Sequence, residues 1–116
     1  MEMNVTTLRE RLVKVTFAGR LDTAGVDRVE TRFIACLVPE ANNAIVDLSQ
    51  VDFVASLGIR MLISASRSLR TRQAKLVIYG AQERVNEVFD TVSLGQIVSI
   101  YPTEAEALAA FVSSPT

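Results

Sequence analysis

One stretch of the sequence, residues 43–69, joins a short apolar run to a segment with helical periodicity. The run Ala44–Leu48 is rich in β-branched residues, which is typical of a strand buried on both faces. Behind it, apolar residues recur at three- and four-residue intervals, which predicts an amphipathic helix beginning at about Leu57. The stripe expected to face the core consists of Ile59, Leu62, Ile63, Ser66 and Leu69. A strand that leads directly into a helix favours an α/β fold.

The rest of the chain continues this alternation of strands and helices. Strands are expected over 5–9, 12–18, 75–79 and 96–101, and helices from Asp22 or Thr23 to Pro39, over 82–90, and from Thr103 onward. The first two strands should form a hairpin at Glu10–Arg11, whereas strands separated by helices should be parallel. The order ββαβαβαβα therefore predicts an α/β domain with a mixed, mostly parallel sheet flanked by helices, in which strands 44–48 and 76–79 are central.

The three other helices each have an apolar face that should pack on the sheet. The expected inward residues are Val26, Val29, Phe33, Cys36 and Leu37 in the first helix, Val85, Val88 and Phe89 in the third, and Ala105, Leu108, Ala109 and Val112 in the last. Thr103 and Glu106 fit a capping box at the start of the last helix. Residues 113–116 are expected to fray.

Composition bounds the domain count and excludes several kinds of site. A chain of 116 residues that is 49% apolar suits one domain over 1–116 with a single core. It has no histidine, which removes His-based triads and His metal ligands, and Cys36 alone forms neither an internal disulfide nor a thiolate metal site. Its five glycines make no phosphate-binding motif. We therefore expect a non-enzymatic protein without metal or cofactor.

Charge and hydropathy make nucleic acid and membrane improbable partners. The net charge of −1 creates no general attraction to polyanions, and no apolar run reaches the ~20 residues that span a bilayer. The N-terminus lacks a signal-peptide pattern, so we expect a cytoplasmic protein that does not insert into membranes. The carboxylates of Asp22, Asp47 and Asp52 follow or end strands, but a catalytic pair requires a separation that sequence alone does not give.

Ser56 falls where the helix after the central strand begins. Serine is favoured as an N-cap because its hydroxyl accepts a hydrogen bond from an otherwise unpaired backbone N–H. The free N–H groups and the helix dipole would also tolerate a phosphate on this residue. A purely structural cap and a modifiable hydroxyl are both consistent with the position.

The residues after Ser56 offer two further features. Leu57, Met61 and Ala65 lie off the expected core stripe, which fits either scattered surface residues or a small docking patch beside the serine. No acidic residue occurs between Asp52 and Glu83, whereas five basic residues do: Arg60, Arg67, Arg70, Arg72 and Lys75. These form either a solvated helix face or a basic flank that attracts an acidic partner.

The segment Ile45–Leu62, with the sequence IVDLSQVDFVASLGIRML, resembles the signature of the STAS domain, a family that includes bacterial anti-sigma factor antagonists. In this family a segment of the form hhDLS…hxFhDSxG (h, apolar) places a phosphorylatable serine at the start of the second helix. The sequence GRLD, at 19–22, matches a second family motif, and the later elements also correspond. Two positions depart from the pattern: Ala55 replaces an aspartate, and Leu57 replaces a common serine or threonine, which leaves Ser56 as the only acceptor in the loop.

The resemblance implies a partner-switching mechanism. The unmodified domain binds an ATP-binding serine kinase that doubles as an anti-sigma factor, phosphorylation of Ser56 releases it, and a PP2C-type phosphatase resets it. The partner surface expected on this basis comprises Asp22, Thr23, Leu57, Gly58, Arg60 and Met61. Two alternatives are a constitutive subunit of a transporter or scaffold, without phosphorylation, and a binder of a small nucleotide or lipid.

Overall fold

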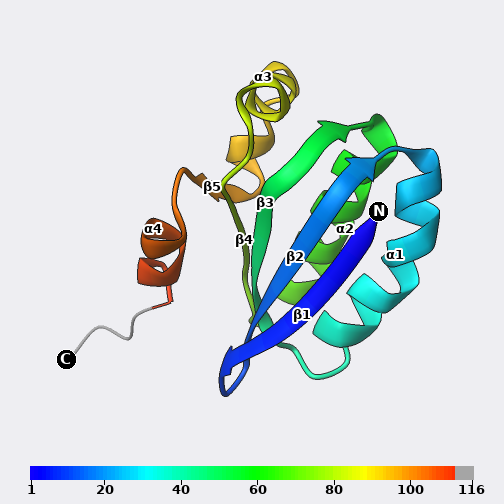
Figure 1. Cartoon of the computed structure of the whole chain (residues 1–116). Coiled ribbons are helices and arrows are strands. Elements are labelled where there is room, and N and C mark those ends of the chain that lie inside the picture. Colours follow the sequence, from blue (N-terminus) through cyan, green and yellow to red (C-terminus); the bar gives the residue numbers. More distant parts are fainter. Residues whose placement is uncertain (112–116) are drawn as a thin grey trace.

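A five-stranded sheet forms the centre of the computed structural model, which describes residues 1–111 (Figure 1). The strands lie side by side in chain order: β1 (Glu2–Arg9), β2 (Leu12–Leu21), β3 (Asn43–Val54), β4 (Leu76–Tyr79) and β5 (Ser99–Tyr101). Strands β1 and β2 are antiparallel and the other neighbours are parallel, as predicted. The hairpin turns at Glu10–Arg11, where Arg11 has a φ of 61°.

Within residues 1–111, four α-helices and one 3-10 helix connect or follow the strands. They are α1 (Thr23–Leu37), α2 (Ser56–Arg70), α3 (Glu83–Thr91), η1 (Leu94–Gln96) and α4 (Glu104–Ala109). The element order agrees with the prediction except at η1, which occupies the start of the strand expected over 96–101. Ser93 has a left-handed backbone, and the following turn buries Leu94 in the core, so only three residues remain for β5. None of the helices within residues 1–111 is both long enough and apolar enough to cross a membrane.

The sheet has apolar packing on both faces, which explains the continuous apolar run of β3. Ala44 and Val46 belong to the larger cluster, which α1, α2 and α3 share, while Ile45 belongs to a smaller cluster on the opposite face with Ala107 of α4. Figure 1 shows α1 and α2 together on one side of the sheet, away from α4. The central placement of β3 and β4 is therefore confirmed.

The predicted inward faces of three helices need correction. Cys36 of α1 is half-buried at the edge of the core, and Val88 of α3 is 36% exposed, whereas the other predicted residues of these two helices are buried. In α4 the prediction was wrong for Ala105 and Ala109, which are exposed, whereas Leu108 is half-buried against the core and Ala107 faces the sheet. Val112 and the predicted tail 113–116 lie outside the described residues.

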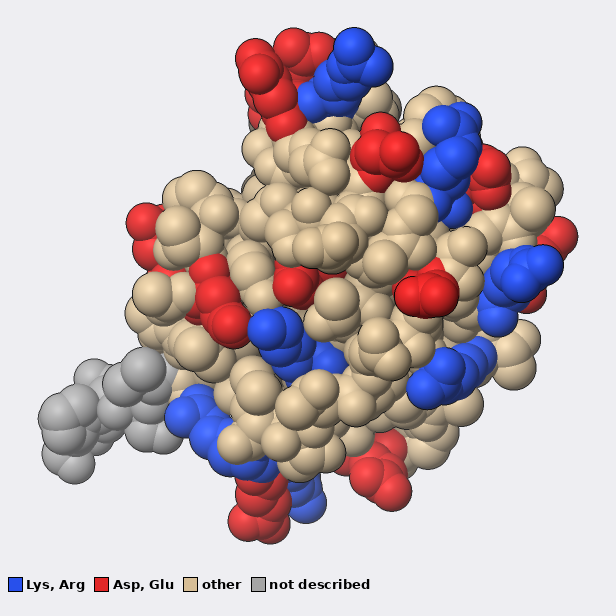
Figure 2. Space-filling view, viewed as in Figure 1, with Lys and Arg blue, Asp and Glu red and all other residues tan. Residues whose placement is uncertain are grey.

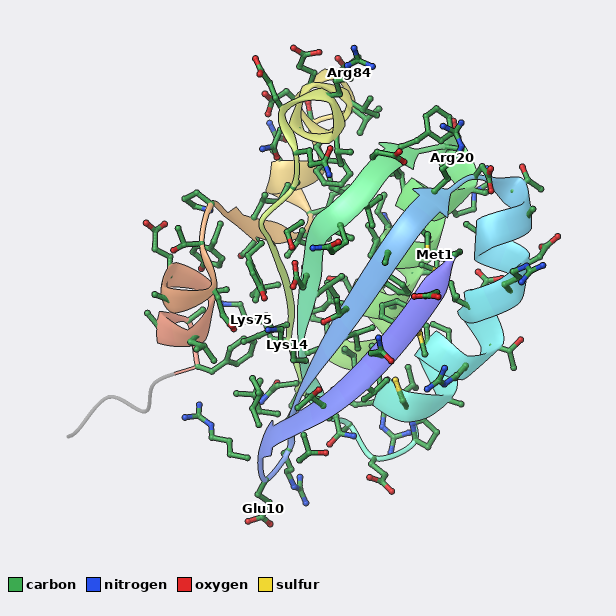
Figure 3. All side chains as sticks on the ribbon, in the orientation of Figure 1. Met1, Glu10, Lys14, Arg20, Lys75 and Arg84 are labelled. Atoms are coloured by element: carbon green, nitrogen blue, oxygen red, sulfur yellow. The ribbon has the colours of Figure 1, made fainter. Side chains whose placement is uncertain are left out.

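Polar contacts hold α4 in this orientation. Lys14 of β2 reaches across the sheet face to Glu104, with Nζ 3.1 Å from Oε2 (Figure 3). Arg9 donates a hydrogen bond to the Phe111 carbonyl. Thr103 caps the helix by accepting a hydrogen bond from the Glu106 N–H at 3.3 Å, which confirms the Thr103 half of the predicted capping box. These contacts rotate the short helix so that Ala107 packs on the sheet.

Strand β3 is much longer than the predicted run 44–48, because it continues to Val54 beside β2. Two β-bulges each insert one extra β3 residue into this pairing: Thr16 pairs with Asp47 but Ala18 pairs with Gln50, and the same shift recurs before Phe53. Bulges increase twist and re-aim the side chains that follow them. The extended part of β3 therefore carries the chain to the start of α2.

Two glycines allow α1 and α2 to begin close to the end of β2. A Cβ on Gly25 would lie 2.1 Å from the Arg20 carbonyl oxygen, and one on Gly58 would lie 3.0 Å from the Leu21 carbonyl oxygen. In both cases the near atom belongs to the backbone, which cannot rotate away. Glycine at these positions brings the first turns of both helices against the same two residues of β2.

We predict that Gly25→Ala destabilises the domain, although alanine usually stabilises a helix by about 1 kcal/mol relative to glycine. The clash with the Arg20 backbone requires the helix to shift, so the free energy of unfolding should fall by about 1–3 kcal/mol. Urea denaturation followed by circular dichroism measures this change. Gly95→Ala is the control, because nothing lies within 4 Å of its added Cβ. Equal stability of Gly25→Ala and the unchanged protein would contradict the proposed close approach.

Asp22 caps α1 and should make the stability of the domain depend on pH. Its Oδ1 accepts a hydrogen bond from the Gly25 N–H at 2.8 Å, and this bond, assisted by Arg20, holds the pKa of Asp22 below its ordinary 3.8. A carboxylate whose folded pKa is lowered stabilises the fold above the unfolded pKa, and this stabilisation disappears as pH falls through the folded pKa.

We therefore predict that Asp22→Ala is less stable than the unchanged protein at pH 7 and that the difference shrinks below pH 3.8. Denaturation curves at several pH values measure both effects. Asp27→Ala removes an exposed carboxylate from α1 without removing a cap, so it should change the stability less at pH 7. A difference that persists unchanged in acid would refute this role of Asp22.

Candidate functional site

Ser56 is the first residue of α2, and its side chain is exposed. The N-cap is Ala55, in an extended conformation with φ −89° and ψ 171°, so the prediction that Ser56 caps the helix was wrong by one residue. Ala55 has no side-chain acceptor, so the unpaired N–H groups of the first turn lack a side-chain cap. The serine hydroxyl thus stands at an uncapped, electropositive helix start.

Two neighbouring side chains share the solvent-facing side of this turn. Leu57 is 36% exposed, and Arg60, one helical turn after Ser56, is exposed as well. The backbone beneath them is fixed, because the Ala55 N–H donates a hydrogen bond to the Leu21 carbonyl at 2.9 Å. Ser56, Leu57 and Arg60 therefore form a small exposed surface on a rigid support.

Three other residues of α2 are buried, although the sequence analysis places them at or near the surface beside Ser56. Met61 is only 1% exposed and Ala65 is fully buried, so the expectation that they are semi-exposed was wrong. Gly58 is also buried, and an added Cβ would lie within 3.2 Å of Leu21 and Val54. Helix α2 contacts α1 as well as the sheet, so its buried face is wider than the single predicted stripe, and Ile63 lies at the edge of it.

Asp22 and Thr23 lie at the start of the neighbouring helix. Strands β2 and β3 are parallel and pair as far as Leu21 and Val54, so α1 and α2 begin at the same edge of the sheet. Thr23 is exposed, whereas Asp22 is half-buried by its capping role. Both residues are thus close in the chain to the part of β2 that supports Ser56.

The carboxylates of Asp22 and Asp47 have separate structural partners, the Gly25 N–H for Asp22 and Ser49 for Asp47. Asp47 is buried and accepts hydrogen bonds from the backbone N–H and the hydroxyl of Ser49, at 2.9 and 2.7 Å. These bonds satisfy the polar groups beside the first β3 bulge. Within residues 1–111 there is no group of acidic residues and cysteine arranged to hold a metal ion.

Most of the basic residues after Asp52 lie far from Ser56. Arg67 and Arg70 occupy the last turn of α2, where positive charge complements the helix dipole, and Arg70 donates a hydrogen bond to the Ile97 carbonyl at 2.9 Å. Fourteen residues of helix put Arg70 about 20 Å from Ser56. Figure 2 shows charges of both signs interspersed on the visible face. Of the basic residues considered as a flank for Ser56, only Arg60 therefore remains.

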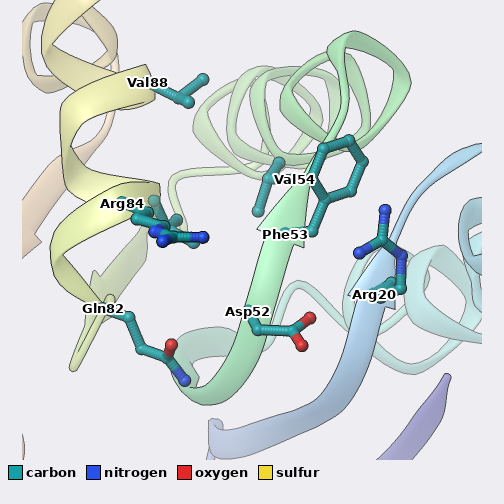
Figure 4. Close-up of a pocket in the computed structure, with 8 residues that line it drawn as sticks. Arg20, Asp52, Phe53, Val54, Gln82, Arg84 and Val88 are labelled. Atoms are coloured by element: carbon teal, nitrogen blue, oxygen red, sulfur yellow. The ribbon is translucent and has the colours of Figure 1, made fainter.

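A pocket lies between the end of β3 and α3 (Figure 4), and its lining was not predicted by the sequence analysis. Its volume is about 380 Å³. The residues around it are Arg20, Asp52, Phe53, Val54, Gln82, Arg84, Val85 and Val88. The Arg20 guanidinium stacks 4.2 Å from the centre of the Phe53 ring. These residues come from three elements, so their proximity depends on how β3 and α3 pack.

Comparison with known proteins agrees with the fold and the motif. An anti-sigma-B factor antagonist of Listeria monocytogenes is 29% identical over 94 residues, which cover 81% of this chain and 82% of that protein. The solved anti-sigma factor antagonist SpoIIAA, in its unphosphorylated form, is 18% identical with a TM-score of 0.78, over 97% of this chain and 100% of that one. Its phosphorylated form, at 18% identity over 96% and 100% of the chains, gives a TM-score of 0.72.

Similar domains also occur within larger proteins. The murine anion transporter Slc26a9 has a region that matches 85% of this chain with a TM-score of 0.74 at 19% identity, and this region is 17% of that chain. The STAS domain family itself matches residues 4–107. This match covers β2 to β5, all but the first two residues of β1, and the motif around Ser56, and on this basis the chain belongs to the STAS domain family.

Proposed function

We propose that this protein is a phosphorylation-controlled binding module of the anti-sigma factor antagonist type. With Ser56 unmodified, it binds a serine kinase that has an ATP-binding kinase fold and acts as an anti-sigma factor or similar switch protein. Phosphorylation of Ser56 releases it, and a PP2C-type phosphatase restores the binding form. The observation that carries the proposal is the exposed hydroxyl of Ser56 at the uncapped start of α2.

The physical chemistry of this position suits a switch. A phosphate adds about −1.5 to −2 charges, which the free N–H groups and the dipole of α2 tolerate without unfolding the domain. Inside a protein–protein interface, the same charge is costly to desolvate. Changing a bound-to-free ratio from 99:1 to 1:99 requires a loss of about 5.5 kcal/mol of binding free energy. Several contacts must therefore be disrupted at once.

The proposed partner surface surrounds Ser56. It comprises Leu57 and Arg60 of α2, together with the half-buried Asp22 and the exposed Thr23 at the start of α1. Because Gly58 and Met61 are buried, they support this surface from below and offer a partner no side-chain contact. The protein acts by binding and performs no catalysis itself.

The names of similar proteins, and the phosphorylation states in which one of them was solved, support this assignment. The similar Listeria protein is an anti-sigma-B factor antagonist, and SpoIIAA is a solved antagonist with an unphosphorylated and a phosphorylated form. The second candidate is a constitutive subunit of a transporter or scaffold complex, which the resemblance to a region of the mouse anion transporter favours. The two functions differ in whether Ser56 matters for binding.

Phosphorylation should occur at Ser56 and should abolish binding. We predict that incubation with the kinase and ATP adds one phosphate to Ser56, which tandem mass spectrometry locates. Ser56→Ala should bind the kinase as the unmodified protein does, whereas Ser56→Asp should bind at least about tenfold more weakly, measured by calorimetry. Ser64→Asp places the same charge at an exposed position two turns along α2, and it should bind normally.

Each alternative outcome has a distinct meaning. Phosphate at another residue, or equal binding by Ser56→Asp and Ser64→Asp, would contradict the switch. Co-purification in one stable complex, whether residue 56 is Ser, Ala or Asp, would favour the constitutive subunit.

A further inference from the structure

The pocket between β3 and α3 leaves two large apolar side chains in contact with solvent. Phe53 is 39% exposed and Val88 is 36% exposed, and both line the pocket above Val54 and Val85, which are buried. Scattered exposed apolar residues are normal on a protein surface. Two that line one concave site form a place where a partner's apolar side chain can be buried.

The same pocket has basic groups from two elements. Arg20 belongs to the end of β2 and stacks on Phe53, and Arg84 belongs to α3 and points towards β3 in Figure 4. Arg20 also pairs with Asp22 at 3.6 Å, whereas Arg84 has no ion pair within residues 1–111. The Asp52 carboxylate lies on the β3 side, so the lining residues carry two positive charges and one negative charge. Because Arg20 is already paired with Asp22, Arg84 is the lining cation left without an ion pair among the described residues, and it offers a binding group for an anion.

The β3 side of the pocket is close in the chain to Ser56. Phe53 is three residues before Ser56, and the segment between them is held to β2 by backbone pairing at Leu21. Figure 3 shows Arg20 and Arg84 at the same end of the molecule, opposite Glu10 at the hairpin turn. A partner that covers Ser56 and Leu57 therefore meets the pocket at the edge of its footprint.

We propose that this pocket is a second contact for the partner that binds Ser56, and that it receives an apolar side chain from an acidic segment of that partner. The apolar side chain packs between Phe53 and Val88, and flanking carboxylates pair with Arg20 and Arg84. This inference rests on the proposed function and specifies the chemistry of the partner.

An acidic segment in this pocket would also strengthen the switch. Its carboxylates lie beside the place where phosphate is added, so the phosphate repels them as well as disrupting the contacts at Ser56. Binding energy from the pocket is thereby coupled to the state of the serine, although no pocket residue is modified.

The test uses peptide probes and the full-length protein labelled with ¹⁵N. One synthetic peptide has the sequence Glu-Glu-Leu-Leu-Glu-Glu, and its charge-inverted counterpart has lysine in place of glutamate. We expect the acidic peptide to shift the amide resonances of Phe53, Arg84 and Val88, and the lysine peptide to shift them at least about tenfold less at equal concentration. Equal shifts from both peptides, or no shifts from either, would overturn the proposal. Saturation of the pocket by inorganic phosphate alone would also overturn it, in favour of a small anion site.

Variants then connect the pocket to the kinase. Val88→Ser and Arg84→Ala should each weaken binding of the unphosphorylated protein to the kinase about five- to thirtyfold, the effect of losing one interface anchor. The matched controls are Leu8→Ser, an equally exposed apolar residue near the hairpin turn, and Arg72→Ala, an exposed arginine after α2, and both should bind normally.

The two proposals fail in different ways. Normal kinase binding by Val88→Ser and Arg84→Ala, with binding lost in Ser56→Asp, would overturn the pocket contact and leave the switch intact. Selective binding of the acidic peptide at the pocket, with indifference of the kinase to residue 56, would support the pocket and reject the switch.

Discussion

The structure depends on the close contact between the end of β2 and the first turns of two helices. The Leu21 carbonyl accepts a hydrogen bond from the Ala55 N–H, and Gly25 and Gly58 let α1 and α2 approach the backbone of Arg20 and Leu21. Because backbone atoms make these contacts, side-chain motion cannot loosen them. The two helix starts are therefore fixed relative to each other, and Ser56 is presented on a rigid support.

The bulges of β3 determine what surrounds Ser56. They insert two residues into the pairing with β2 and twist the last part of the strand, so that the Phe53 ring stacks on Arg20 while Val54 enters the core. Asp47 satisfies the backbone at the first bulge through Ser49. The Asp-Leu-Ser part of the motif thus has a structural role in bending the strand. Ser56, at the start of the helix, is the serine whose hydroxyl is accessible for reaction.

The sequence predicted the fold well, because the strands and helices differ clearly in the period of their apolar residues. The elements, their order and the parallel pairing followed from runs such as Ala44–Leu48 and from helical spacing after Leu57. The prediction failed where tertiary contacts decide the orientation of a residue. Met61 is buried because α2 packs against α1 as well as the sheet, and Ala55 rather than Ser56 precedes the helix. Residues of β2, β3 and α3 line the pocket, and no local sequence pattern predicts that these residues lie together.

The absence of a side-chain cap at Ala55 has a thermodynamic consequence. The absence of a side-chain N-cap typically destabilises a helix by about 1 kcal/mol, so the first N–H groups of α2 lack a side-chain acceptor. A negatively charged phosphate on the next residue, Ser56, would provide this acceptor. The modification would then raise the melting temperature of the isolated domain while it lowers the lifetime of the complex. The phosphorylated, released domain would then resist unfolding better than the unmodified domain.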